Sequence, residues 1–228
     1  MLKKIMLIAA AAAVFCCGCS ADYSNIDGYD RIMNARELYA GLYGAHLTVT
    51  DEGRGLVTQE LTFLYDDVDR LAYSYYGTDG ETEYREYHDG YEYSYTDENG
   101  EWATIKEGEQ NYRGYNRVSK LSMADVGMIF IKPESIESST VEQKGSDTII
   151  TTVYRSEELS EMMSAQLGTD GTLTEFSVIY TLNSTGYCTS MEQKGVAELN
   201  GETQKIDYLL TIDSMNDIAK INPPSELQ

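Results

Sequence analysis

Apolar and polar residues alternate with a period of two along most of this chain, and this pattern constrains the fold more than any other feature. In the stretch from Gly90 to Ile105, tyrosines stand at every second position from Tyr91 to Tyr95. Alternate residues of a strand point to the same side of a sheet, so these rings are expected on one face. The turn signals T-D-G, H-D-G and D-E-N-G follow one another about ten residues apart. This spacing predicts consecutive hairpins in an antiparallel meander.

Strand patterns of this kind recur to the end of the chain. We expect six strands between about residues 45 and 105, and five more at 136–141, 148–154, 173–182, 187–199 and 204–212. The segment from Glu83 to His88 alternates poorly, which predicts an edge strand or a bulge. Apolar residues at helical spacing predict short helices at 27–43, 118–130 and 156–167.

A sheet of eleven strands must curl or stack, because a flat one would twist heavily and expose a long apolar face to water. We therefore expect an α+β fold, in which a strongly curved, mostly antiparallel half-barrel of about eleven strands packs against two or three short helices. The chain has three prolines and no glycine-rich or serine-rich linker. Residues 27–224 are accordingly predicted to form a single domain.

Two short segments of the second half are similar. They read V-E-Q-K-G at 141–145 and M-E-Q-K-G at 191–195. Each is expected at the end of a strand, leading toward a hairpin. An old duplication and shared turn chemistry explain this similarity equally well.

The N-terminal segment reads as a targeting signal. Lys3 and Lys4 precede an apolar run that ends at Phe15 and is too short to cross a bilayer comfortably. The run ends in F-C-C-G-C-S, which resembles the lipobox of bacterial lipoproteins, cleaved just before a cysteine that carries diacylglycerol. The resemblance implies a signal peptide at residues 1–18, lipidation of Cys19, and a tether at 19–26.

The lipobox resemblance has one departure, because Cys16 stands where that family usually has leucine. Cys17 is the weaker candidate for lipidation, since bulky Phe15 and Cys16 precede it. The alternative is an ordinary secretory signal with incidental cysteines. With lipidation, several acyl chains on Cys19 would hold the protein firmly at the extracytoplasmic face of the bacterial cell membrane, which a single chain does not achieve.

The negative charge of the chain excludes some classes of binding partner. Residues 1–18 contain two lysines and no acidic residue, so cleavage leaves 15 basic and 38 acidic residues and a formal charge of −23. Such a chain lacks the basic footprint that nucleic acid requires. It is equally poorly matched to anionic headgroups, so we expect membrane attachment through the lipid alone.

Motifs that carry catalysis are absent from the sequence. His46 and His88 are the only histidines and lie in separate contexts, and no zinc, phosphate-loop, dinucleotide or nucleophile-elbow motif occurs. The acidic turns lack the spacing of a calcium loop. After cleavage only Cys19 and Cys188 remain, so no disulfide framework is available, and Cys188 is expected to be a half-buried sheet residue. We therefore expect a protein without enzymatic activity, cofactor or metal.

The order of the predicted elements adds a family resemblance. A lipobox, a leading helix, a meander with Y-x-Y-x-Y and G-x-W, a helix ending at I-K-P, an S-E-E-L helix and a final I-x-Y-x-L-x-I strand before N-P-P occur in turn. This order, over residues 27–224, resembles the LolA/LppX-like lipoprotein-carrier superfamily. The resemblance implies an unclosed barrel whose concave side holds acyl chains. Carried onto this chain, the ligand-lining residues would be Leu61, Phe63, Tyr65, Leu71, Tyr73, Tyr75, Tyr91, Tyr93, Tyr95, Trp102, Phe176, Val178, Tyr180, Tyr208 and Leu210.

Two functions follow from this set. The first is a membrane-anchored extracytoplasmic protein that binds a lipid or another hydrophobic or amphipathic molecule. Tyrosines outnumber aliphatic residues in the set, and they suit an amphipathic guest as well as a plain sheet core. The second function is therefore an interaction or sensory module with the same fold, a filled core and a protein partner in the cell envelope.

Overall fold

A computed structural model of the chain describes residues 25–66, 70–110, 135–155, 157, 171–199 and 201–228. The predicted signal peptide, Cys19 and the predicted helix at 118–130 lie outside these residues. So does the predicted helix at 156–167, apart from Glu157. The elements of the described part are α1 (Tyr29–Ala40), β1 (Gly44–Asp51), β2 (Leu56–Tyr65), β3 (Leu71–Thr78), β4 (Glu83–His88), β5 (Glu92–Thr96), β6 (Trp102–Lys106), β7 (Ile136–Lys144), β8 (Asp147–Tyr154), β9 (Gly171–Leu182), β10 (Cys188–Leu199), β11 (Glu202–Asp213) and the 3₁₀ turn Ser225–Leu227.

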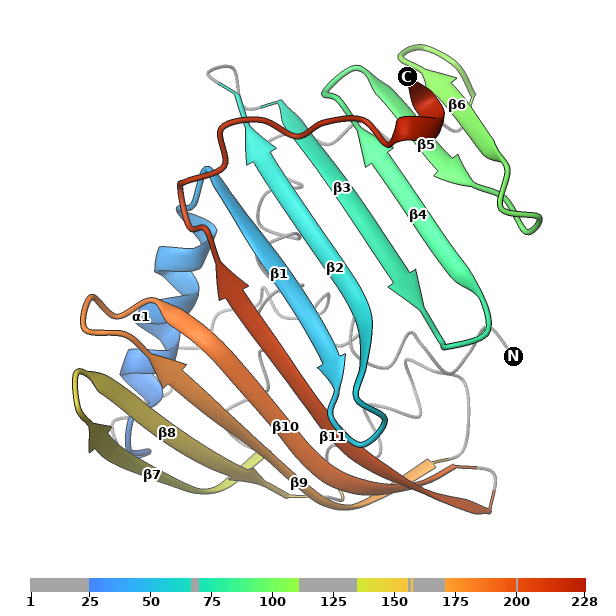
Figure 1. Ribbon diagram of the computed structural model, residues 1–228. Helices are drawn as coiled ribbons and strands as arrows, with labels where there is room; N and C mark the ends of the chain where they lie inside the picture. Colours follow the sequence, from blue (N-terminus) through green and yellow to red (C-terminus); the bar gives the residue numbers. More distant parts are fainter. Residues whose placement is uncertain (1–24, 67–69, 111–134, 156, 158–170, 200) are drawn as a thin grey trace.

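The strands form one antiparallel sheet in the order β6-β5-β4-β3-β2-β1-β11-β10-β9-β8-β7 (Figure 1). Two meanders, β1 to β6 and β7 to β11, are joined side by side where β1 pairs with β11. The sheet is curved but not closed, and β6 and β7 form its edges. The prediction of an unclosed, mostly antiparallel half-barrel is confirmed.

Acidic side chains hold the hairpin turns together. Asp89 Oδ1 accepts hydrogen bonds from the backbone N–H groups of Tyr91 and Glu92, and Asp97 Oδ1 accepts from those of Glu101 and Asn99. The bonds from Glu101 and then Asn99 lower the pKa of Asp97. These aspartates therefore satisfy backbone donors, as turn residues commonly do.

One face of the sheet is the buried one, and we call it the inner face. On the β1–β5 side a registered row crosses five strands and consists of Ala45, Phe63, Tyr73, His88 and Tyr93. On the other side a second row consists of Val49, Leu210, Met191, Tyr180 and Ile150. All ten side chains are buried. The opposite side of the sheet is the outer face.

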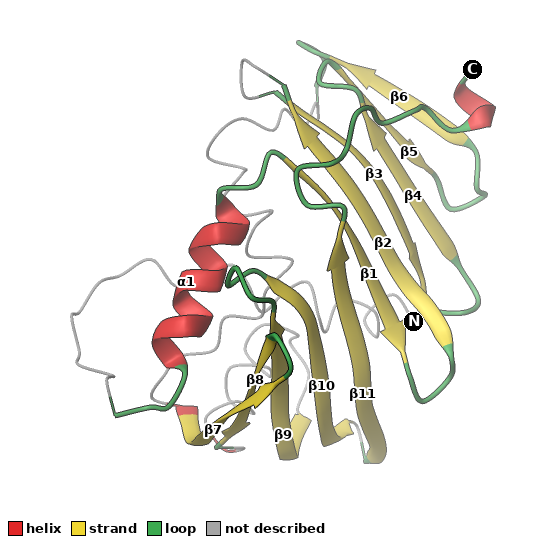
Figure 2. Ribbon diagram, turned by 60° about the vertical axis from the view of Figure 1, so that its left-hand side comes forward, coloured by secondary structure: helices red, strands yellow, loops and turns green. Residues whose placement is uncertain are grey.

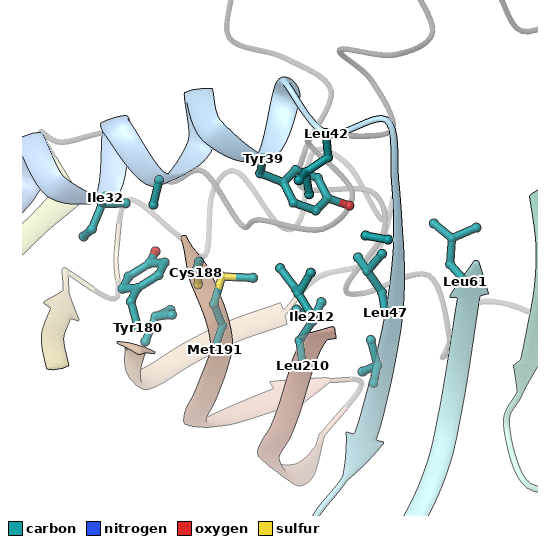
Figure 3. Packing of buried hydrophobic residues seen from close by; sticks show 14 of the residues in the cluster. Ile32, Tyr39, Leu42, Leu47, Leu61, Tyr180, Cys188, Met191, Leu210 and Ile212 are labelled. Atoms are coloured by element: carbon teal, nitrogen blue, oxygen red, sulfur yellow. The ribbon is translucent and has the colours of Figure 1, made fainter. Parts of the chain in front are cut away.

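Helix α1 lies on the inner face at the β7–β11 end (Figure 2). It directs Ile32, Ala35 and Tyr39 toward the sheet, and Figure 3 shows this for Ile32 and Tyr39. The Tyr39 ring meets the Phe63 ring edge-on, with 6.2 Å between the centroids. At its start, Gly28 has φ +75°, and a Cβ there would lie 2.7 Å from Val141. The close approach of glycine therefore seats the helix against β7.

The chain ends in a segment that crosses the outer face, from residue 214 to residue 228 (Figure 1). Asn216 ties its start to β1, because its N–H donates to the carbonyl of Gly44 at 2.7 Å. Ile218 lies over Gly44. Near its end, Glu226 pairs with Arg85 of β4 at 3.3 Å. The segment thus spans the strands between β11 and β4.

Two local expectations were wrong. β4 is neither an edge strand nor bulged: it pairs in regular register with β3 and β5. Its poor alternation has a reason, because Glu86 lies on the inner side and accepts a hydrogen bond from the Tyr73 hydroxyl at 2.9 Å. The segment 191–195 lies in the middle of β10, not at its end, whereas Gly145 does occupy a turn with φ +64°.

Truncating Leu210 tests the role of the β1–β11 junction. Leu210 is 2% exposed in β11, between Val49 and Met191. We expect Leu210→Ala to lower the free energy of unfolding by about 2–5 kcal/mol, because the change leaves a cavity in a closely packed row. Urea denaturation measures the effect.

The adjacent Leu209 is a matched control, since it is half-buried on the outer face. Leu209→Ala is expected to cost about 1 kcal/mol or less. Equal losses for the two variants would show that the inner face does not dominate the stability of this junction.

Candidate functional site

The predicted ligand-lining residues mostly share the inner face. Nine are buried and belong to one hydrophobic cluster, which contains Leu61, Phe63, Tyr65, Leu71, Tyr73, Tyr93, Val178, Tyr180 and Leu210. Four more are partly buried and pack against it, namely Tyr75, Tyr95, Phe176 and Tyr208. The structure therefore brings thirteen of the predicted residues together.

Two predicted residues do not join this face. Trp102 pairs with Thr96, so it lies on the opposite side of its strand pair from Tyr93 and Tyr95. Tyr91 precedes β5 and is 52% exposed, with the Arg70 guanidinium 4.1 Å from its ring centroid. The expectation for Trp102 and Tyr91 was wrong because alternation does not carry through a turn.

The aromatic residues of β3, β4 and β5 pack on one another. Tyr73 stacks on His88 at 5.7 Å, and Tyr93 stacks on Tyr95 at 5.4 Å. Burial, and secondarily the carboxylate of Glu86, raise the pKa of the nearby Tyr75. This part of the inner face is a packed aromatic core.

The same cluster continues beneath α1, where it includes Tyr154, Tyr180 and Cys188. The hydroxyls of Tyr154 and Tyr180 are 3.2 Å apart, and burial raises the pKa of Tyr154 to about 12. Burial also raises the pKa of Cys188 to about 12, and its Sγ donates to the carbonyl oxygen of Ser190. A thiol held in the neutral form is a poor nucleophile. Cys188 is fully buried, not half-buried as expected.

An open polar cleft of about 450 Å³ runs along the exposed flank of α1. Within it, Arg31 Nη1 donates to Thr148 Oγ1 at 3.3 Å, and Thr148 Oγ1 donates to Gln143 Oε1 at 3.2 Å. The cleft is lined by Asp30, Arg31, Asn34, Gln143, Ser146, Thr148, Leu182, Asn183, Ser184 and Gly186. Amides and hydroxyls predominate, so the cleft suits a small polar group. None of the predicted ligand-lining residues is among these.

The inner face contains a polar residue that the sequence interpretation missed. Gln193 is 3% exposed in the middle of β10. A registered row across five strands contains Asp51, Tyr208, Gln193, Val178 and Thr152. This row is separated from the cleft by the packed row of Ile150, Tyr180 and Met191. The signal in the sequence is a glutamine at the position where β10 alternation requires an inward side chain, two residues after Met191.

Two further findings concern metal and membrane. Among the residues that the structure describes, no group of three or more histidine, cysteine, aspartate or glutamate side chains is placed to hold a metal ion. Within the same part of the chain, none of the helices combines the length and the apolar composition of a membrane span.

Comparison with known proteins gives limited similarity. No protein family and no curated protein matches the sequence. The structure is similar to that of LprF from Mycobacterium bovis, with a TM-score of 0.44 and 10% identity over 86% of this chain and 95% of that one. It is also similar to a porin-like protein from Bacteroides uniformis, with a TM-score of 0.26 and 13% identity over 75% of this chain and 97% of that one. Both TM-scores are below 0.5, so a proposal about function has to rest on the geometry of this chain itself.

The burial of Cys188 leads to a test of thiol reactivity. At pH 8 we expect N-ethylmaleimide to leave Cys188 unmodified in the folded protein and to modify it fully in urea, because the thiol is both buried and protonated. Mass spectrometry of the peptide that contains Cys188 measures the modification. Labelling of the native protein at the rate of a free thiol would contradict the packing described.

Proposed function

We propose that this protein is a membrane-anchored extracytoplasmic binding protein, without enzymatic activity, that holds a hydrophobic or amphipathic molecule against its inner face. One observation carries the proposal. Helix α1 has twelve residues and is therefore about 18 Å long. The sheet of eleven strands is about 48 Å wide. The apolar inner face therefore extends well beyond the reach of α1.

An apolar sheet face of this width requires a second layer. A guest molecule is able to provide part of such a layer, as apolar ligands do in concave sites. We place the guest over β9, β10 and β11, on the part of the inner face around Phe176, Gln193 and Tyr208. Phe176 and Tyr208 are only partly buried there, unlike the stacked Tyr73. This region combines apolar rings with a few polar groups, which is the usual composition of a ligand site.

A second candidate function is an interaction module with a filled core. The stacking of Tyr73 on His88 and of Tyr93 on Tyr95 favours it, because those rings fill the β3–β5 part of the inner face themselves. On this alternative, the tyrosines contribute stability only. A protein partner in the envelope would then contact the outer face.

Copurifying lipid distinguishes the two functions. We expect native mass spectrometry and solvent extraction of the purified protein to detect a bound lipid or other amphipathic molecule. Val178→Phe is expected to lower the bound fraction, because a larger side chain in the middle of β9 would take up space that the guest needs over this part of the inner face.

Ile179→Phe is the matched control, since Ile179 precedes Tyr180 on the outer face of the same strand. This variant should retain the bound molecule, and circular dichroism should show both variants folded. A consistently empty protein, in which Val178→Phe changes only stability, would instead support the interaction module.

The membrane anchor is tested separately. We expect Cys19→Ser to move the protein from the membrane fraction to the soluble fraction and to abolish labelling with radioactive palmitate, because the sulfur that would carry the diacylglycerol is gone. Cys17→Ser should leave both unchanged. Retention of Cys19→Ser in the membrane fraction, with the label still attached, would place the lipid elsewhere.

A further inference from the structure

Gln193 is a buried polar side chain in an apolar setting. It is 3% exposed, and the residues beside it on the inner face are Val178 in β9, Tyr208 in β11 and Met191 in its own strand. Val178 and Met191 are both fully buried. None of these neighbours carries a charge. Beyond Tyr208 the row continues to Asp51 of β1, whose carboxylate is already paired with Arg54 at 2.6 Å. The charged residues that flank Gln193 in sequence, Glu192 and Lys194, pair with each other at 2.8 Å on the outer face.

Among the residues that the structure describes, none accepts a hydrogen bond from the amide nitrogen of Gln193. A buried amide donor without a partner incurs the full cost of its desolvation, so nearly all such donors in folded proteins are paired. Gln143 shows the ordinary arrangement, since it is exposed and its Oε1 accepts a hydrogen bond from Thr148. The Gln193 Nε2 group is therefore an interior donor in need of an acceptor.

We propose that Gln193 Nε2 donates a hydrogen bond to the neutral carbonyl oxygen of an acyl ester or acyl amide held over β9–β11. This inference rests on the proposed binding function and specifies the ligand. A carbonyl fits because the glutamine NH₂ group is purely a donor. A neutral acceptor fits because Val178, Tyr208 and Met191 carry no charge. The cation beyond Tyr208, Arg54, is already paired with Asp51, so it does not compensate a further buried carboxylate.

Gln193 would thus act as a specificity residue. Its hydrogen bond distinguishes an acyl ester from a hydrocarbon of the same size, because the hydrocarbon leaves the amide unpaired. The net contribution of one such bond corresponds to about three- to tenfold in affinity. A site without this donor would bind the two molecules equally, since both bury similar apolar area.

Methyl dodecanoate and pentadecane test the proposal, because they have the same number of heavy atoms and differ in the ester group. Displacement of an anilinonaphthalene sulfonate dye measures their affinities for the full-length protein. Gln193→Met removes the donor at similar volume, and Gln193→Leu is a second variant in case the first does not fold. Gln59→Met is the matched control, since Gln59 is also buried on the inner face, in β2, at 8% exposure.

We expect the wild type and Gln59→Met to bind the ester about three- to tenfold more tightly than the alkane. The Gln193 variants should bind both molecules equally, and they should unfold at higher urea concentration because an unpaired buried amide is gone. The infrared carbonyl stretch of the bound ester should move to higher frequency in these variants, since a hydrogen bond lowers it.

Two results would overturn the inference while leaving the proposed function intact. They are equal binding of ester and alkane by the wild type, and an ester preference that survives in Gln193→Met. Failure of both molecules to displace the dye from every variant would count against the binding function itself. The experiment therefore separates the two proposals.

Discussion

The antiparallel ladder between β1 and β11 is the interaction on which the rest of this fold depends. It joins a six-stranded meander to a five-stranded one, in a register that sets Leu47 beside Ile212 and Val49 beside Leu210. The inner faces of the two meanders form one continuous surface only because this register holds. Without the ladder, each meander would retain its hairpins but lose the apolar contacts across the β1–β11 junction. Helix α1 would then lose the broad surface on which it packs.

Alternation in the sequence predicts the strands well, because side chains of one strand must take opposite sides whatever their neighbours are. Alternation alone does not predict which residues of neighbouring strands pair with each other. Trp102 follows a tight turn, and only the register with Thr96 determines its face. β4 looked like an edge strand because Glu86 occupies an inward position, where the Tyr73 hydroxyl satisfies it. That compensation depends on a partner thirteen residues away in the chain, which a local pattern does not contain.

The candidate site was also predictable only in part. The aromatic and aliphatic members of the inner face follow from periodicity alone. Gln193 lies in a segment that was correctly predicted as a strand, but the M-E-Q-K-G similarity placed it at the end of that strand, whereas it lies in the middle of β10. The polar cleft could not be predicted, because Arg31 of α1, Gln143 of β7 and Asn183 after β9 meet only through tertiary packing.

The pairing of the first strand with the last also sets the timing of folding. β1 begins at Gly44 and β11 at Glu202, so the ribosome adds roughly 160 residues after β1 has started before its partner begins. At typical rates of about 5–20 residues per second, this takes roughly 8–30 seconds. During that interval β1 is able to pair with β2, but its other edge lacks its native partner β11, and an open strand edge is prone to aggregation. We therefore expect a nascent chain of this topology to benefit from chaperones that keep it apart from other chains until synthesis is nearly complete.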